Sequence, residues 1–179
     1  MTLEFRKGSV VFATTDAIVN AANSHLMHAG GLARAIADAA GPALSAECDL
    51  IDEVPTGSAL ATTAGDLAAR WVIHAVGPVW HGGDSGEAEL LASAYRSSLE
   101  VAVEVGARSI AFPSISTGIF GYPLELAAPV AIGAVREAWA EHAGAIDAVA
   151  FHLYSDREFD LFVRAANHVH RAPPAGGAP

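Results

Sequence analysis

The sequence predicts a three-layer α/β fold in which a central, mixed but mostly parallel sheet is flanked by helices on both faces. Short apolar segments alternate along the chain with longer segments of helical spacing, a pattern typical of parallel sheets with crossover helices. The 179 residues are 52% hydrophobic and 17% charged, which is enough apolar material for one core of ordinary size. We therefore expect one domain over residues 1–171, followed by a disordered Ala/Pro/Gly tail over residues 172–179.

The first two elements are predicted to be strands at the edge of the sheet. Residues 3–7 alternate between apolar and polar side chains, as a half-exposed strand does. The apolar run Val-Val-Phe at 10–12 resumes this pattern after the break at Gly8-Ser9.

A buried strand and two helices come next. The apolar run 17–19 predicts a buried strand that stops at Asn20, and a polar, glycine-bearing loop separates it from an Ala-rich helix beginning at about Leu32. The pair Gly41-Pro42 ends that helix and starts a second one, which is expected to reach about residue 52.

The remaining chain continues the alternation of strands and helices. A flexible loop is expected at 82–86, and a second glycine-bearing loop at 113–121 joins a buried strand to a helix. The predicted strands are 58–63, 71–76, 109–112 and 148–153, and the predicted helices are 87–105, 124–142 and 156–171.

The unit of buried strand, glycine-bearing loop and helix therefore occurs twice, and it points to an anion site. Ligands of parallel sheets bind beyond the carboxyl ends of the strands, where both loops are expected to meet. The Gly30-Gly31 pair would leave backbone N–H groups and the positive end of a helix facing that place, although two glycines can also form a simple tight turn. The dinucleotide fingerprint Gly-x-Gly-x-x-Gly and the Walker loop are both absent here, which disfavours those two phosphate-binding families. Two facing amide-rich loops would suit a diphosphate.

Charge and cysteine content restrict the partners and the compartment. Acidic residues number 20 against 10 basic ones, and the net charge of −10 argues against nucleic-acid binding, so any phosphate has to be bound by backbone N–H groups. The single Cys48 cannot form an internal disulfide, and no leader is evident at the N-terminus, which favours a cytoplasmic protein. No apolar run approaches the length of a membrane span. We expect a soluble monomer with no membrane partner.

Four motifs in the same order together resemble the macrodomain, the module that binds ADP-ribose. They are Asp-Ala-Ile-Val-Asn-Ala-Ala-Asn at 16–23, Gly-Gly at 30–31 before the Ala-rich helix, His-Ala-Val-Gly-Pro at 74–78, and Ile-Ala-Phe-Pro-Ser-Ile-Ser-Thr-Gly-Ile-Phe-Gly at 110–121. The resemblance covers nearly the whole chain. It implies a macrodomain-like fold and a function in binding free ADP-ribose or ADP-ribosylated proteins, without a cofactor.

The resemblance also implies a set of ligand-binding residues. Asn23 would bind the distal ribose, the start of the first helix and the second loop would hold the diphosphate, Phe120 would flank the distal ribose, and Tyr154 would stack against adenine. The full set is Ser9, Val10, Asn20, Asn23, Ala29, Gly30, Gly31, Leu32, Ser116, Thr117, Gly118, Ile119, Phe120, Gly121 and Tyr154.

Departures from the family pattern concern adenine recognition and catalysis. Ser9 stands where the family usually has an aspartate that accepts a hydrogen bond from adenine, so recognition is expected to be weaker by roughly 1 kcal/mol. Ala33 and Ala37 replace the aspartate and histidine of the hydrolase subclass. The alternative function, hydrolysis of ADP-ribosyl esters on acidic side chains or of O-acetyl-ADP-ribose, would then be weak and substrate-assisted, with Asn23 and Gly31 shaping the catalytic site.

Two other chemistries are less well supported by the sequence. His25, His28, His74 and His81 could suggest a metal, but no cysteine or acidic residue stands at a matching spacing, so no metal site is predicted. Ser114, Ser116 and Thr117 could be nucleophiles, but Gly-x-Ser-x-Gly is absent and no His–Asp pair can be assigned to them. A hydroxyl-rich phosphate loop is the simpler interpretation.

Overall fold

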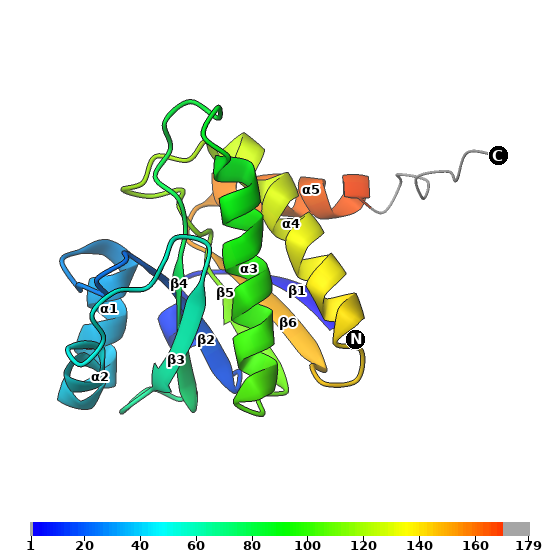
Figure 1. Ribbon diagram of the computed structural model, residues 1–179. Helices are drawn as coiled ribbons and strands as arrows, with labels where there is room; N and C mark the ends of the chain where they lie inside the picture. Colours follow the sequence, from blue (N-terminus) through cyan, green and yellow to red (C-terminus); the bar gives the residue numbers. More distant parts are fainter. Residues whose placement is uncertain (1, 170–179) are drawn as a thin grey trace.

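The computed structural model describes residues 2–169. The tail predicted at 172–179 lies outside the described residues. The chain forms a six-stranded sheet in the order β1-β6-β5-β2-β4-β3, in which every neighbouring pair is parallel except β3 with β4 (Figure 1). The strands are β1 (Thr2–Lys7), β2 (Ala17–Ala22), β3 (Ala59–Thr63), β4 (Trp71–Val76), β5 (Ser109–Phe112) and β6 (Ala148–Leu153).

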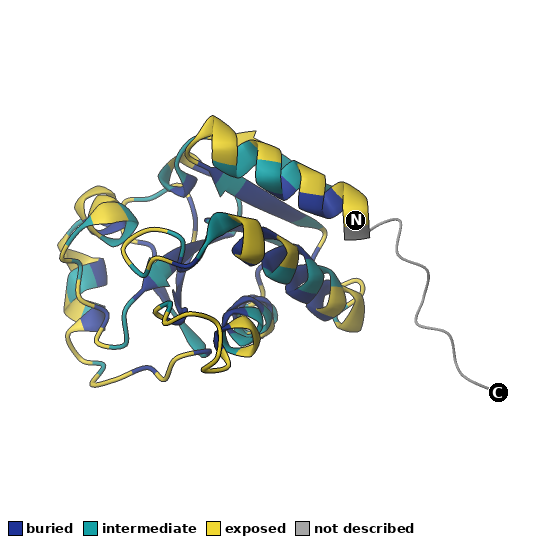
Figure 2. Cartoon of the chain, turned by 90° about the horizontal axis from the view of Figure 1, so that it is seen from above, coloured by how far each residue is buried: buried dark blue, intermediate teal, exposed yellow. Residues whose placement is uncertain are grey.

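Helices cover both faces of the sheet. The helices α3 (Glu87–Glu104), α4 (Leu124–Glu141) and α5 (Asp156–Val169) pack on one face, and α1 (Gly31–Ala40) and α2 (Pro42–Cys48) pack on the other. The buried sides of these helices form stripes that face the sheet, while their outer sides are exposed (Figure 2). The predicted three-layer α/β architecture is confirmed.

Two apolar clusters, one on each face, explain why the central strands are continuous apolar runs. Val19, Ile73 and Ile110 point to the α3–α4–α5 side, whereas Ile18 and Val72 point to the α1–α2 side. All five side chains are almost completely buried. A strand that is covered on both faces has no polar side, and this is what the absence of alternation in the sequence indicated.

Most of the predicted elements are confirmed, but one element type and two boundaries are wrong. Residues 10–12 form a 3₁₀ helix, η1 (Val10–Phe12), rather than an edge strand, because the Ser9 side chain caps the turn at the Val11 N–H and the Ala13 N–H donates to the Val10 carbonyl. Strand β2 continues beyond Asn20, since its pairing with β4 extends to Ala22 and Val76. Helix α2 ends at Cys48, four residues earlier than expected.

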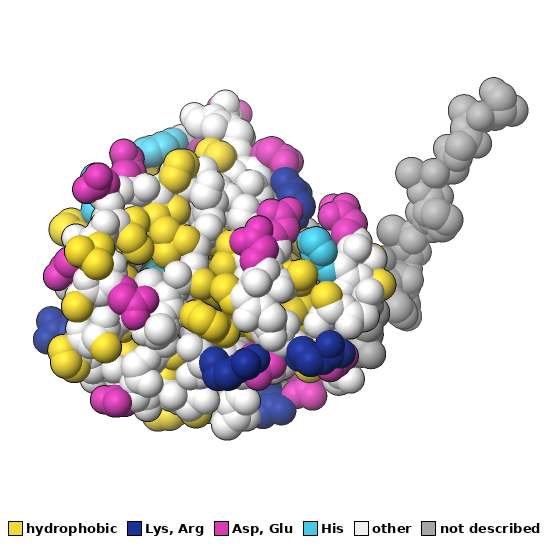
Figure 3. Space-filling model, turned by 60° about the horizontal axis from the view of Figure 1, so that its bottom comes forward, with side chains coloured by type: hydrophobic (Ala, Val, Ile, Leu, Met, Phe, Trp, Pro, Cys, Tyr) yellow, Lys and Arg dark blue, Asp and Glu magenta, His cyan; other side chains and the backbone are white. Residues whose placement is uncertain are grey.

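The surface of the described residues carries charges of both signs. Its ion pairs, such as Arg108 with Asp147 and Arg70 with Asp16, join exposed or half-exposed side chains and therefore contribute little to the free energy of unfolding. On the face drawn in Figure 3, Lys and Arg side chains lie close to Asp and Glu, with exposed hydrophobic side chains between them. Within the described residues, no helix combines the length and the apolar character that crossing a membrane requires.

Candidate ligand-binding site

A cavity of about 710 Å³ lies beyond the carboxyl ends of the five parallel strands. The residue that follows each of these strands lines it: Gly8 after β1, Asn23 after β2, Gly77 after β4, Pro113 after β5 and Tyr154 after β6. The volume is that of a typical small-molecule site. The cavity therefore occupies the place at which open α/β sheets bind their ligands.

The N-terminus of α1 forms one wall of the cavity. Gly30 is extended and Gly31, the first helical residue, has a left-handed φ of 58°. No side chain caps this helix, and among the described residues the N–H groups of Gly31, Leu32 and Ala33 donate to no protein atom. These free donors and the helix dipole make the wall attractive to an anion.

The opposite wall is loop 2, defined as residues 113–123 between β5 and α4. Ser116 adopts a left-handed φ of 67°, which is a strained conformation for a residue with a side chain. The loop is held from below by Tyr95, whose hydroxyl accepts from the Ile115 N–H and donates to the Pro113 carbonyl. In the part of the chain that the structure describes, the N–H groups of residues 116–120 donate to no protein atom. Loop 2 thus adds a second set of free backbone donors.

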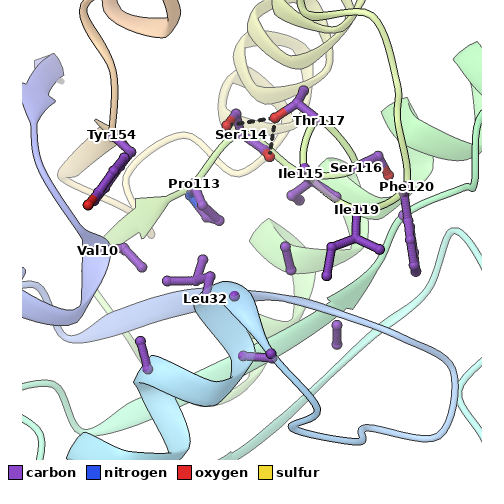
Figure 4. Close-up of a pocket in the computed structure, with 18 of the residues that line it drawn as sticks. Val10, Leu32, Pro113, Ser114, Ile115, Ser116, Thr117, Ile119, Phe120 and Tyr154 are labelled. Atoms are coloured by element: carbon purple, nitrogen blue, oxygen red, sulfur yellow. Dashed lines mark hydrogen bonds between the residues drawn. The ribbon is translucent and has the colours of Figure 1, made fainter.

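Figure 4 shows how the two walls face each other: Leu32 of α1 lies opposite loop 2, with Tyr154 and Val10 toward one end and Ile119 and Phe120 toward the other. An elongated ligand can therefore place one group at each end and its middle between the two sets of N–H groups.

The cavity holds no basic side chain other than a neutral histidine. None of its lining residues is Lys or Arg, and burial lowers the pKa of His152. Glu158 is the one lining carboxylate; it accepts hydrogen bonds from the Ser114 hydroxyl at 2.6 Å and from the Ser155 N–H at 2.8 Å. An anion in this cavity has to be bound by backbone N–H groups, as the net charge of the chain also suggested.

The structure brings most of the predicted site residues together. Those that line the cavity are Ser9, Val10, Asn23, Ala29, Gly30, Gly31, Leu32, Ser116, Thr117, Gly118, Ile119, Phe120 and Tyr154. Asn20 and Gly121 do not line it. The Gly121 N–H closes a turn on the Gly118 carbonyl, so this glycine shapes loop 2.

Asn20 lies in the interior of β2 rather than in a loop. It is 1% exposed, and its amide nitrogen is 3.1 Å from Nδ1 of His74 on the neighbouring strand β4. The expectation that Asn20 ends the strand was wrong. Asn commonly forms turns, and the sequence does not show that its amide has a hydrogen-bonding partner, His74, on the neighbouring strand.

Asn23 organises the loop that carries it, loop 1, defined as residues 23–30. Its Oδ1 accepts from the N–H groups of His25 and Met27, and its Nδ2 donates to the Met27 carbonyl at 2.9 Å. One amide hydrogen remains for a ligand. Ser9 likewise has a local role, because its Oγ caps η1. Direct ligand contacts by these two side chains stay predictions.

The two alanines singled out by the sequence are in different environments. Ala33 lines the cavity, so the position at which the hydrolase subclass is expected to carry an aspartate is open to a ligand. Ala37 is buried in the core between α1 and the sheet. The candidate nucleophile Ser114 donates to Glu158, and Thr117 donates to Ser114 (Figure 4). No described histidine reaches either hydroxyl.

Sequence reasoning missed several lining residues, among them Gly8, Gly77, Ile115, His152 and Glu158. Two of them carried a topological signal, because Gly8 and Gly77 come directly after predicted strands. Because all parallel strands end at one edge of the sheet, each such position could have been added to the site.

The fold also brings together His28, Cys48 and His74. His25 and His81 are not part of this group. The sequence argument that no cysteine matches the histidines was therefore wrong, because Cys48 reaches them from the end of α2.

The fold and the site define an α/β protein with an elongated cavity whose two walls carry free backbone N–H groups. The Macro domain family matches residues 19–131, and a Macro domain-containing protein of Chlorobaculum tepidum is 53% identical over 159 residues, covering 89% of this chain and 92% of that protein. This chain belongs to the Macro domain family.

Two further relatives carry names that refer to ADP-ribose. An Oceanobacillus iheyensis macrodomain mutant with ADPR superposes with a TM-score of 0.89 at 34% identity, covering 95% of this chain and 94% of that one. An O-acetyl-ADP-ribose deacetylase of Klebsiella pneumoniae is 53% identical over 132 residues, covering 72% of this chain and 75% of that protein.

Proposed function

We propose that this protein binds ADP-ribose, either free or attached to a protein. The observation that carries the proposal is the pair of walls: free N–H groups at the start of α1 and in loop 2 face one cavity that contains no Lys or Arg. Such walls bind a diphosphate without a cation. The Oceanobacillus iheyensis macrodomain with ADPR and a Trypanosoma brucei macrodomain in complex with ADP-ribose, which is 38% identical, support the choice of ligand.

The two ends of the cavity fit the two halves of this ligand. Adenine would lie against Tyr154 and Val10, and the distal ribose would lie toward Phe120 at the other end (Figure 4). The family resemblance adds Asn23, which also lines the cavity, to the contacts of that ribose. Tyr154 is 84% exposed at the rim, so an aromatic face is available for stacking. That the protein acts as a cytoplasmic monomer stays a prediction from the sequence.

Calorimetric titration tests the proposal. ADP-ribose should bind with 1:1 stoichiometry, and AMP and ribose 5-phosphate should each bind at least ~10-fold more weakly because neither spans both walls. Equal affinity for AMP and ADP-ribose would overturn the proposed arrangement of the ligand. No binding of any of the three would overturn the proposed function.

A charge reversal at the α1 wall makes the test specific. Gly31→Glu should abolish ADP-ribose binding, because its carboxylate would compete with the diphosphate for the same N–H groups. Gly106→Glu is the matched control: both glycines have a left-handed φ, 58° and 71°, and neither Cβ would meet an atom within 4 Å. Both variants should lose similar stability, but Gly106→Glu should keep its affinity. Retained affinity in Gly31→Glu would contradict binding at this wall.

A weak hydrolase is the second candidate function, favoured by the similarity to the Klebsiella pneumoniae O-acetyl-ADP-ribose deacetylase. Ala33 can neither activate nor position a water molecule, so turnover would depend on the phosphate of the ligand and on loop backbone, with Asn23 and Gly31 shaping the site.

A further inference from the structure

The group of His28, Cys48 and His74 lies outside the proposed ligand cavity, since none of the three residues lines it. Each residue comes from a different segment: loop 1, the last residue of α2 and the interior of β4. One potential ligand atom from each residue lies within 4.8 Å of the other two. Nε2 of His74 is 3.7 Å from Sγ of Cys48.

The hydrogen bonds around the group orient its central histidine. The Asn20 amide contacts Nδ1 of His74 at 3.1 Å, and this directs Nε2 toward Cys48 and toward the Thr62 hydroxyl at 2.9 Å. Histidines that bind metals usually donate their other ring N–H to an acceptor, and the Asn20 amide fills this role when its Oδ1, which has no partner among the described residues, faces Nδ1.

The third member of the group leaves a polar atom without a partner. Nε2 of His28 is buried and makes no hydrogen bond within the described structure. A buried nitrogen without a partner is unfavourable, and no described protein atom compensates for it. A bound ion would provide its missing partner.

The electrostatic surroundings favour a cation. Cys48 stands between the acidic residues Glu47 and Asp49, and burial lowers the pKa of His28 and, to about 4, that of His74. Both imidazoles are therefore neutral near pH 7, the form that binds metals. Burial raises the pKa of the Cys48 thiol to about 11, so metal binding would release its proton to solvent.

We propose that His28, Cys48 and His74 form a binding site for one zinc ion. Zinc accepts two imidazole nitrogens and one thiolate, with bonds of about 2.0–2.3 Å, and leaves a fourth position for water or the Thr62 hydroxyl. In a tetrahedral site these ligand atoms lie roughly 3.5 Å apart, so the widest pair has to approach by about 1 Å. The ion would fasten loop 1 to α2 and β4 directly behind the cavity.

Cobalt(II) titration of the full, reduced and chelator-treated chain tests the site. We expect one equivalent to produce thiolate-to-cobalt charge-transfer absorption, and zinc to remove it by displacement. Cys48→Ser should lose the charge-transfer band. His28→Gln should weaken cobalt binding by at least ~100-fold, since even indirect partners of metal ligands matter by about 10–100-fold.

His25→Gln is the matched control, because His25 lies in the same loop, is exposed and is absent from the group. It should bind cobalt as the wild type does. Circular dichroism of each variant separates loss of the site from loss of the fold. No charge-transfer band in the folded wild type, or equal cobalt affinity in His28→Gln and His25→Gln, would overturn the proposal.

Discussion

Ala33 is the residue on which binding and hydrolysis differ. Its methyl group lines the cavity, and the preceding turn supplies free N–H groups but no acid or base. General acid–base catalysis contributes about 10²–10⁴-fold, so the wild type should release ADP-ribose slowly or not at all. Ala33→Asp places a carboxylate at this wall and should increase release.

The measurement is single-turnover release of ADP-ribose from a protein modified on acidic side chains. Fast release by the wild type would contradict the binding-module function. Gly31→Glu serves as the control for a contaminating hydrolase, because its release should fall together with its affinity.

Ser9 limits the recognition of adenine. The serine can accept a hydrogen bond but carries no charge, and its Oγ is already used as the cap of η1. Ser9→Asp keeps a capping side chain and adds a charged acceptor, so ADP-ribose should bind about 5-fold more tightly. The gain should be smaller for the inosine analogue, which lacks the amino donor, and calorimetry of both ligands compares them. An equal gain for both would contradict a contact with that amino group.

Asn20 shows where prediction from residues reaches its limit. Its sequence motif identified the right segment, but only the pairing of β2 with β4 reveals that its amide meets His74. Asn23, three residues later, was correctly placed at the cavity. Asn20 lies inside β2 and Asn23 lies directly after it, and the residue type, which is the same at both positions, cannot reveal this difference.

At the scale of elements, loop 2 depends on the absence of a side chain at the end of β4. A Cβ on Gly77 would lie 2.2 Å from Oγ of Ser116 and 2.5 Å from Cγ2 of Ile115. Gly77→Ala should therefore displace loop 2 and reduce ADP-ribose affinity by at least ~10-fold, because the N–H groups of the loop would move away from the diphosphate.

Gly133→Ala is the control for Gly77→Ala, since Gly133 lies in α4, does not line the cavity, and its Cβ would meet no atom within 4 Å. Calorimetry gives the affinities, and thermal unfolding gives the stability of each variant. Similar affinities for the two alanine variants would contradict the dependence of loop 2 on Gly77.

The elements themselves were predictable to different degrees. Strands β4, β5 and β6 match their predicted ranges because each is a mostly apolar run with a clear end: Gly-Pro follows β4, Pro follows β5, and Tyr-Ser before an acidic helix start follows β6. Residues 10–12 were predicted wrongly because three apolar residues fit a strand and a 3₁₀ turn equally well. The hydrogen bond from the Val11 N–H to the Ser9 side chain favours the 3₁₀ turn, and the apolar pattern does not show it.

At the scale of the whole molecule, buried histidines make stability depend on pH. In the unfolded chain, His74 becomes protonated as the pH falls below about 6.5. In the folded chain it stays neutral down to about pH 4, because burial lowers the pKa of this imidazole. The free energy of unfolding should thus fall as the pH decreases across this window, by about 3 kcal/mol at most. The pKa values of His28 and His152 are lowered as well and act in the same direction.

Chemical unfolding at several pH values between 4 and 7.5, with chelator present, measures this dependence. His74→Gln should flatten it, whereas His25→Gln, which replaces an exposed histidine, should leave it unchanged. The same slope in His74→Gln and the wild type would contradict the assignment, whatever the absolute stability of the variant.

The chain lines the cavity at five separate places between Gly8 and Tyr154, one after each parallel strand. A fragment of the chain that lacks any one of these five strand ends therefore has an incomplete cavity. A ligand that contacts several of these strand ends therefore opposes every local unfolding reaction that separates them, because each such reaction must also lose the binding free energy of the ligand. Fraying of the outer helix ends leaves the ligand contacts intact and is not opposed. Amide hydrogen exchange would record this as slowed exchange in all five strands at once, even in those that contribute a single residue to the site.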